Sequence, residues 1–400
     1  MTRVREESDD GQMRAVTGRA AAAMMCLVAA PAAADCVTEL TGLLDELAAR
    51  HWHDETRSAA GKARGSVAGV CAGSPTILRA AGRLLTELDD PGVRIMDGAH
   101  FERTLGEWTG EPLVGVGLTE VLSIDIDEQT KRLTVIAPVP GSPAAAAGLC
   151  AGDVVVSING AATAPLGLTA SMKRLRVAAG QNVALTILRH DQVREVALRA
   201  TELPPLEPVS AEVFRSGELK VLHLQLHQFI PGSADALRDA IAAAGEVDAI
   251  VLDLRGNPGG LVDELQAVAG LFLAPRTSIA AVRGAEPALI AVPETAGPID
   301  IPLAVIIDAG SASAAEALAG ALQAHGRARL YGQQTFGKGL VHQTLPIVGA
   351  GVVMFPAGQL ETPDGRPILG SGIDPDVRTV NPLTAAGSDL GKSLNVGRRR

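Results

Sequence analysis

The chain contains few aromatic residues, which make up 2% of its 400 residues. Proteins that hold single-stranded nucleic acid commonly stack its bases on aromatic side chains. The net charge of −10 at pH 7 also repels a polyanion. Both shortages, of aromatic rings and of positive charge, indicate that nucleic acid is not a partner of this protein.

Cysteines and long apolar segments are scarce as well. The four cysteines, at positions 26, 36, 71 and 150, do not have the spacing of a metal site. The segment His51-Trp-His53-Asp54 groups two histidines, which is weak evidence for a metal. We therefore expect neither a metal nor a cofactor. The apolar segment near the N-terminus is only 11 residues long, and no run of 18 uninterrupted apolar residues occurs elsewhere, so we expect no transmembrane anchor.

Residues 1–34 are typical of an export signal. Arg14 and Arg19 precede the apolar segment 20–30, and small residues end at Ala34. We expect cleavage after Ala34 and a mature protein in the periplasm or another extracytoplasmic space. The alternative is an alanine-rich helix of a cytoplasmic domain.

The next region, residues 35–110, is predicted to be helical. Its part from Val37 to Leu88 is rich in Ala, Leu and Arg, and could pack on a core or form a homodimer contact. In an oxidising compartment Cys36 could form a disulfide with Cys71, which would leave Cys150 over.

Residues 111–202 form a distinct unit with glycine-rich turns and alternating apolar segments. Its segments Leu113–Thr119 and Ala147–Gly160 resemble those of a PDZ domain. The resemblance implies that the unit captures a peptide C-terminus by adding it as a strand to a sheet edge. The backbone N–H groups of Val116, Gly117 and Leu118 would then bind the terminal carboxylate. The alternative is that the glycines here only lead into a strand.

Residues 203–380 alternate strand-like and helix-like segments, which predicts an α/β core. The expected strands are Leu219–Leu226, Ala249–Leu254 and Pro302–Asp308, and Ala234–Ala244 is the expected helix. Apolar residues make up 47% of the chain, enough for sizeable cores in two or three domains. The end of the chain, 381–400, is rich in Gly and Ser and is predicted to be disordered.

A serine and a lysine in this core could perform amide hydrolysis together. Lys338 follows Ser313 by 25 residues, and a predicted helix, Ala314–His325, and a predicted strand, Arg327–Gln333, lie between them. Such a pair of elements returns the chain to near its starting plane. Ser313 would lie at a helix N-terminus, where free N–H groups favour an oxyanion. Taken alone, Ser313-x-x-Glu316 is also a helix-capping box.

A lysine acts as a general base only in its neutral form. With an ordinary pKa near 10.4, a lysine must shift by about 3.4 units, or roughly 4.6 kcal/mol, to be neutral at pH 7. Burial can supply a shift of this size if no carboxylate pairs with the ammonium. No acidic residue lies near Lys338 in sequence, so we expect a desolvated lysine that takes the serine proton.

Five ordered motifs resemble those of the carboxyl-terminal processing peptidases, the serine peptidases of the S41 type. They are Val251–Gly260, Ser311–Glu316, Phe336–Gly339, Thr362–Arg366 and Gly372–Asp376. The resemblance covers most of the chain. It implies a crotonase- or ClpP-like α/β protease core beside the PDZ domain and the helical segment.

The resemblance also implies the site. It makes Ser313 the nucleophile and Lys338 the base, and it places a second oxyanion donor at Gly259 or Gly260 beside the N–H of Ala314. The family usually has a glutamine four residues after the lysine, whereas this chain has His342 there and Gln343 next. Adjacent strand residues face opposite sides, so Gln343 could replace it only through a bulge or a register change. We interpret His342 as a possible orienting residue.

We therefore predict an exported serine endopeptidase that binds protein C-termini through its PDZ domain and cleaves through an acyl-enzyme. One alternative is an inactive relative that acts as a PDZ binding or scaffold module. Another is a crotonase-like enzyme that acts on a small acyl substrate. Gating of the site by the PDZ domain would predict a resting structure in which Ser313 and Lys338 are not bonded.

Overall fold

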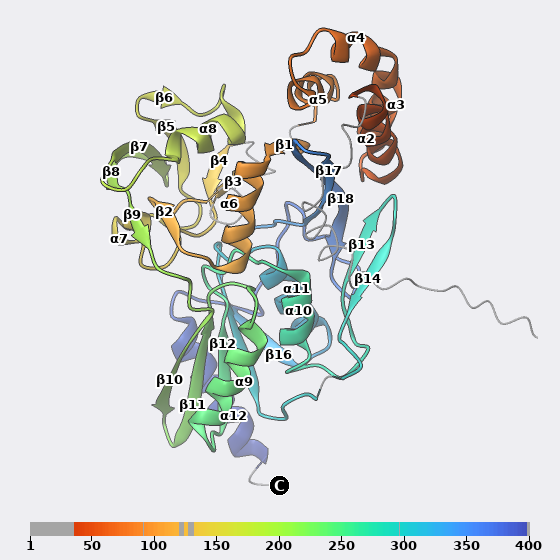
Figure 1. The fold of residues 1–400 in the computed structure, drawn as a ribbon. Coiled ribbons are helices and arrows are strands. Elements are labelled where there is room, and N and C mark those ends of the chain that lie inside the picture. The colour runs from red at the N-terminus through yellow and green to blue at the C-terminus, as the bar shows by residue number, and fades with distance from the viewer. Residues whose placement is uncertain (1–35, 91, 120–123, 127–131, 296, 398–400) are drawn as a thin grey trace, which may run out of the picture.

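The fold was analysed in a computed structural model. It describes residues 36–90, 92–119, 124–126, 132–295 and 297–397, so the predicted signal segment, 1–34, lies outside the described residues. Figure 1 shows a bundle of helices at one end, a β-rich domain beside it, and an α/β core below both.

The N-terminal region is helical, as predicted. Its elements are α2 (Cys36–Arg50), α3 (Asp54–Ala63), η1 (Arg64–Ser66), α4 (Val67–Ala72) and α5 (Ile77–Thr86). A disulfide joins Cys36 to Cys71 and so ties α2 to α4. Leu40, Leu44 and Leu47 of α2 are fully buried against the other helices and an adjoining sheet. None of the described helices is both long and apolar enough to cross a membrane.

The adjoining sheet is antiparallel. Its strands are β1 (Arg94–Asp97), β13 (Ser278–Gly284), β14 (Ala288–Ala291), β17 (Leu340–Ile347) and β18 (Gly351–Glu361). Strand β18 pairs with β1, β13 and β17. One face packs on the helical bundle, and the other packs on α6 (Gly98–Thr109), where Phe101 and Met354 are buried together.

The PDZ-like unit is inserted between two short strands that pair with each other, β2 (Leu113–Gly115) and β9 (Thr201–Leu203). Its remaining elements are β3 (Ile124–Ile126), β4 (Leu133–Val135), α7 (Pro143–Ala146), β5 (Val154–Ile158), β6 (Ala161–Ala162), α8 (Gly167–Leu175), β7 (Asn182–Arg189) and β8 (Gln192–Arg199). The sheet order is β3-β4-β5-β7-β8, so β3 is an edge strand among the described residues.

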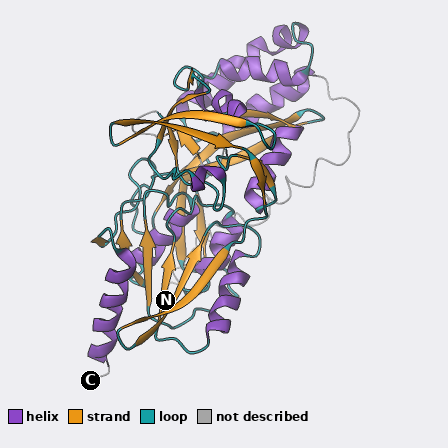
Figure 2. Cartoon of the chain, turned by 90° about the vertical axis from the view of Figure 1, so that its left-hand side faces the viewer, coloured by secondary structure: helices purple, strands orange, loops and turns teal. Residues whose placement is uncertain are grey.

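The core is a six-stranded sheet, and helices cover both of its faces (Figure 2). Its strands run in the order β10 (Val209–Ser216), β11 (Leu219–Leu226), β12 (Ala249–Asp253), β15 (Leu303–Ile307), β16 (Ala328–Gly332) and β19 (Val377–Arg378), with all pairs parallel except β10–β11. Helices α9 (Ser233–Ala244), α10 (Val262–Ala269) and α11 (Ala314–Ala324) cover one face. The parallel strands place the segments that follow β12, β15 and β16 at one edge of the sheet.

The end of the chain differs from the prediction. Residues predicted to be disordered form α12 (Pro382–Gly397), which covers the second face of the core sheet. Leu383, Ala386 and Leu390 lie at helical spacing and pack against buried strand residues such as Val251 and Ile306. The prediction considered the glycines and serines of this segment and missed its apolar residues at helical spacing. Packing of these residues on the core sheet stabilises the helix.

Candidate active site

Ser313 lies in the turn between β15 and α11 at this edge of the sheet. Its backbone has φ 55° and ψ −115°, a conformation that costs energy for a residue with a side chain and is concentrated at functional sites. The turn places Ser313 immediately before α11, where free N–H groups and the helix dipole favour a negative charge. Gly259 lies directly against it, since a Cβ atom there would be 2.8 Å from the Ser313 Cβ.

Lys338 lies in the loop that follows β16. The flanking glycines are needed for close packing: a Cβ atom on Gly339 would be 2.3 Å from the backbone of Leu369, and Gly337 has a φ of 91°. This loop is held against the turn between β15 and α11, which contains Ser313, because the Phe336 N–H donates to the Ser311 carbonyl at 3.0 Å. The fold therefore brings the two predicted loops together.

Glu316 joins these two loops most directly. Its Oε2 atom accepts hydrogen bonds from the backbone N–H groups of Ser313 and Lys338, each at 2.8 Å. Its Oε1 atom accepts from the Gly337 N–H at 2.7 Å and from the Thr335 hydroxyl at 2.5 Å. The sequence indicated only a capping residue here, whereas the carboxylate fixes the serine and the lysine relative to each other.

The Glu316 carboxyl is fully buried. Burial raises its pKa to about 7, although its four hydrogen-bond donors oppose the rise. With a folded-state pKa above the ordinary 4.5, the group stabilises the fold most at low pH, and this contribution is lost as pH rises through about 7. A proton on this carboxyl would occupy one of the acceptor positions that the backbone donors of the two loops use.

Lys338 has a carboxylate partner, contrary to the expectation from its sequence neighbours. Its Nζ atom lies 2.8 Å from Oδ2 of Asp125, which comes from strand β3 of the PDZ-like unit. Within the described residues, no hydrogen bond joins the Ser313 hydroxyl to the Lys338 side chain. Two residues 213 positions apart in sequence meet here, and no spacing rule connects them.

The residue after His342 does not replace the glutamine usual in the family. The pairing of β17 with β18 shifts register between Val341 and His342, which is the irregularity that could have turned Gln343 toward the lysine. The Gln343 side chain instead accepts a hydrogen bond from Arg50 of α2. Of His342 and Gln343, His342 is therefore the residue that interacts electrostatically with Lys338.

His342 is neutral at ordinary pH. Burial lowers its pKa to about 3, and the positive charges of Arg94 and Lys338 act in the same direction. A neutral imidazole can accept a hydrogen bond. The orienting role of His342 stays a prediction, and it requires the neutral form that this pKa provides.

Replacing His342 with glutamine should make the fold less sensitive to acid. Because its folded pKa lies below the ordinary 6.5, the unfolded state takes up the proton first, and stability is lost as pH falls below 6.5. Between pH 7.5 and pH 5.0 this loss is about 2 kcal/mol. Urea unfolding at both pH values should show the wild type losing about 2 kcal/mol more than His342→Gln. Equal losses would contradict this account.

The three predicted oxyanion donors differ in their surroundings. A Cβ atom on Gly259 would lie 3.0 Å from the Ala314 nitrogen, so these two backbones are close together. The Gly259 N–H donates to Asn257 Oδ1 at 2.9 Å, however, and is thus engaged. Gly260 packs instead against Phe229, whose carbonyl oxygen a Cβ atom would approach to 2.1 Å. Of the two glycines, Gly259 is the one whose backbone lies beside Ala314, and the oxyanion roles of these residues stay predictions.

The predicted carboxylate-binding loop is largely buried. Val116 and Leu118 are 2% and 6% exposed. The Gly117 carbonyl accepts from the Val139 N–H at 2.9 Å, and a Cβ atom on Gly117 would collide with Ser142. The loop is therefore held firmly at the start of the segment leading to the edge strand β3.

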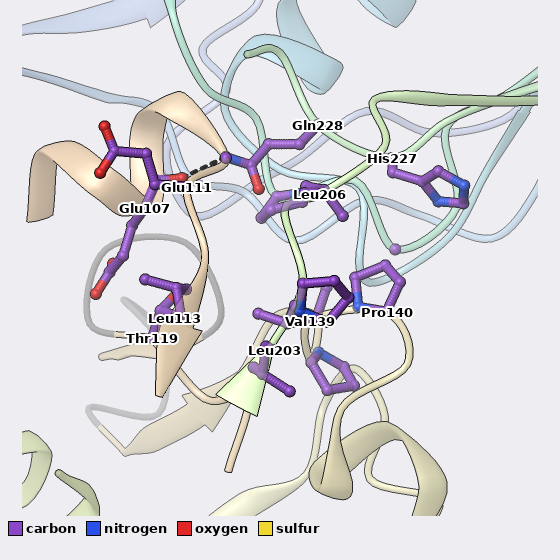
Figure 3. A pocket seen from close by; sticks show the side chains of 16 residues that line it. Glu107, Glu111, Leu113, Thr119, Val139, Pro140, Leu203, Leu206, His227 and Gln228 are labelled. Carbon is purple, nitrogen blue, oxygen red and sulfur yellow. Dashed lines mark hydrogen bonds between the residues drawn. The ribbon is translucent and has the colours of Figure 1, made fainter. Parts of the chain in front are cut away.

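A small cavity lies between the PDZ-like unit and the turn at residues 256–260 that follows β12 (Figure 3). It has a volume of about 30 Å³, and Gly256 and Pro258 form part of its wall. Across it, the Gln228 side chain donates to the Glu107 carbonyl at 2.8 Å. The residues that line this cavity come from α6, from the PDZ-like unit and from the turn that begins at Gly256.

The residues that the sequence did not single out for the site are Asp125, Arg94 and Asn257. A signal existed for Asn257, which lies within the glycine-rich motif already noted. Asp125 and Arg94 carried none, because their importance comes from the placement of one domain on another.

Two family models match the chain. The model of peptidase family S41 matches residues 220–379, and that of the PDZ domain matches residues 134–189. A carboxyl-terminal-processing protease of Picosynechococcus sp. is 37% identical over 307 residues, which are 74% of this chain and 71% of that protein. A protein of the same name from Synechocystis sp. is 36% identical and covers 75% of this chain and 70% of its own length.

A solved structure shares the fold. The photosystem II D1 C-terminal processing protease matches with a TM-score of 0.74 over 90% of this chain and 99% of that chain, at 23% identity. The match confirms the predicted architecture of a helical N-terminal segment, a PDZ domain and an α/β protease core.

Proposed function

Because this chain belongs to the carboxyl-terminal-processing proteases of serine peptidase family S41, we propose that it is an exported endopeptidase that hydrolyses polypeptides through a Ser313–Lys338 dyad. The observation that carries this proposal is Glu316, a buried carboxylate that binds the backbones of both residues. A helix cap explains the hydrogen bond from Glu316 to the Ser313 N–H, but it does not explain the hydrogen bond to the Lys338 N–H.

The first chemical step forms an acyl-enzyme. Neutral Lys338 takes the proton of the Ser313 hydroxyl as Oγ attacks the carbonyl carbon of the scissile bond. The N–H groups of Ala314 and Gly259 stabilise the oxyanion that develops on the carbonyl oxygen. The C–N bond then breaks, and the leaving amine takes the proton from the Lys338 ammonium.

The second step hydrolyses the ester. Lys338 accepts a proton from water as the water oxygen attacks the acyl carbon, and the proton returns to Ser313 Oγ when the ester bond breaks. Both steps need Lys338 without a carboxylate partner, so the pairing with Asp125 belongs to a resting state.

The PDZ domain supplies substrate selection in this proposal. A peptide C-terminus would add to the edge strand β3, with its carboxylate held by the N–H groups of Val116, Gly117 and Leu118. The fixed backbone of that loop supports this role, because preorganised donors bind an anion without an ordering cost. A location outside the cytoplasm is supported by the Cys36–Cys71 disulfide, which persists in oxidising compartments.

A pair of unstructured peptides that differ only in a free or an amidated C-terminus tests the proposal. The wild type should cleave the free acid at least about tenfold faster, since charge-assisted hydrogen bonds to the carboxylate are lost on amidation. Ser313→Ala should cleave neither peptide. Equal cleavage of both peptides would refute C-terminal selection. Absence of cleavage by the wild type would favour a binding module.

A further inference from the structure

Asp308 follows β15 and begins the turn that contains Ser313. Its Oδ1 atom accepts hydrogen bonds from the N–H groups of Gly310 at 2.9 Å and of Gly256 at 3.0 Å. Gly310 belongs to the same turn, whereas Gly256 begins the turn at residues 256–260 that follows β12. One carboxylate oxygen therefore joins the turn of the predicted nucleophile to the turn of the predicted glycine donors.

Two further hydrogen bonds join the segments that follow β12 and β15. The buried Ser311 hydroxyl donates to the Leu254 carbonyl at 2.7 Å. The Ala312 N–H donates to the Asn257 carbonyl at 2.9 Å. Ser311 also holds Asp308, because its hydroxyl accepts from the Asp308 N–H at 3.1 Å. The link through Asp308 differs from the other two, because its side chain accepts from one backbone N–H of each turn.

The two turns are in direct backbone contact. A Cβ atom on Gly310 would lie 3.0 Å from the Cα atom of Gly256, so a side chain at position 310 would push the turns apart. A Cβ atom on Gly259 would lie 2.8 Å from the Ser313 Cβ atom and 3.0 Å from the Ala314 nitrogen. Because the turns touch at both places, a shift of one turn changes the position of the Gly259 N–H relative to Ser313.

We propose that Asp308 is a positioning residue, which fixes the turn at residues 256–260 against Ser313 and so sets where the oxyanion of the substrate is bound. This inference rests on the proposed function, in which the N–H groups of Ala314 and Gly259 stabilise that oxyanion. Such donors act at about 3 Å from the oxyanion, and removal of one donor lowers kcat by about 10²- to 10³-fold. A donor that is displaced with its turn loses a similar factor.

The positioning role depends on the oxygen of Asp308 and not on its charge. Among the described residues, the hydrogen bonds to this carboxylate all go to its Oδ1 atom. Burial raises the pKa of the Asp308 carboxyl, and the bonds from Gly256 and Gly310 oppose the rise. A negative charge also disfavours a second negative charge nearby, such as the oxyanion. An asparagine, whose amide oxygen can accept both backbone bonds, should therefore replace the carboxylate.

Asp308→Ala and Asp308→Asn test the proposal with an unstructured protein as the substrate. Asp308→Ala should lower kcat by about 100-fold and leave KM within about threefold, because the oxyanion develops only on the way to the transition state. Asp308→Asn should recover kcat to within about threefold of the wild type, because it keeps the acceptor. Asp239→Ala, which changes an exposed acid of α9, should digest the protein at the wild-type rate.

Amide hydrogen exchange measures the link itself and needs no activity. In Asp308→Ala the N–H groups of Gly256 and Gly310 lose their acceptor, so peptides that contain them should exchange at least about tenfold faster than in the wild type. Asp308→Asn should exchange like the wild type. Asp308→Leu has nearly the shape of the asparagine variant but no acceptor, and it replaces Asp308→Ala in both assays if urea unfolding shows that the alanine variant is not folded.

The two assays separate this proposal from the proposed function. Wild-type kcat in Asp308→Ala or Asp308→Leu would overturn the positioning role, and so would an Asp308→Asn variant as slow as Asp308→Ala. An unchanged exchange rate in Asp308→Ala would overturn it whether or not the protein cleaves. If the wild type cleaves nothing while exchange rises in Asp308→Ala, the proposed function is wrong and only the link between the two turns stands.

Discussion

Lys338→Ala should lower kcat/KM for an unfolded polypeptide by about 10⁴-fold, and Ser313→Ala by at least as much. The backbone N–H of Lys338 donates to Glu316, which also binds the Ser313 N–H, so the lysine is held beside the serine. Without it, the hydroxyl of Ser313 has no base, and the helix N-terminus alone stabilises the transition state. Initial rates of digestion of an unstructured protein measure this loss.

Two companion variants make this result specific. Lys338→Arg keeps a positive charge that cannot be removed near neutral pH, so it should be as inactive as the alanine variant. Lys392→Ala changes an exposed lysine of α12 whose side chain is 75% exposed, and it should retain full activity. Wild-type rates for Lys338→Ala would eliminate the lysine as the base.

Glu316→Ala should remove most of the activity and also destabilise the fold. Four donors from the two catalytic loops would lose their acceptor inside the protein. Each buried unsatisfied donor costs about 1–3 kcal/mol, so the total loss should be about 4 kcal/mol or more even without strict additivity. We expect kcat to fall by at least about 100-fold because Ser313 and Lys338 are no longer held together. Urea unfolding and digestion rates check both effects.

A conservative change separates positioning from stability. Glu316→Gln keeps one oxygen acceptor but turns an amide toward backbone donors, so it should recover part of the stability and little of the activity. Glu294→Ala serves as the matched control, because the Glu294 side chain is 72% exposed and pairs with the exposed Arg276. A fully active Glu316→Ala would show that the loops do not depend on this carboxylate.

The elements around the nucleophile could be predicted because their signals are local. The predicted strand Leu219–Leu226 has the bounds observed for β11, and the predicted helix after Ser313 differs from α11 by one residue at its end. Apolar periodicity and turn glycines decide such elements within a window of about a dozen residues. Ser313 and Lys338 were predicted as nucleophile and base in this way and through their motifs, and the structure places their two loops side by side.

The interactions of these residues with distant parts of the chain could not be predicted. Asp125 reaches Lys338 because a domain docks on the core, and Gln343 turns to Arg50 because a helical bundle packs on β17. Glu316 was predicted as a cap, but three of its four donors come from a loop about 20 residues further on. The apolar stripe of α12 had meaning only once the exposed face of the core sheet was known.

The pairing of β2 with β9 bears on how such proteins diversify. The two ends of the PDZ domain lie next to each other, because Leu113 before the domain pairs with Leu203 after it in a two-stranded sheet. An insertion whose ends meet can be exchanged for another without altering the strand order of the protease core. The unit at this position and the core sheet can then change independently in evolution.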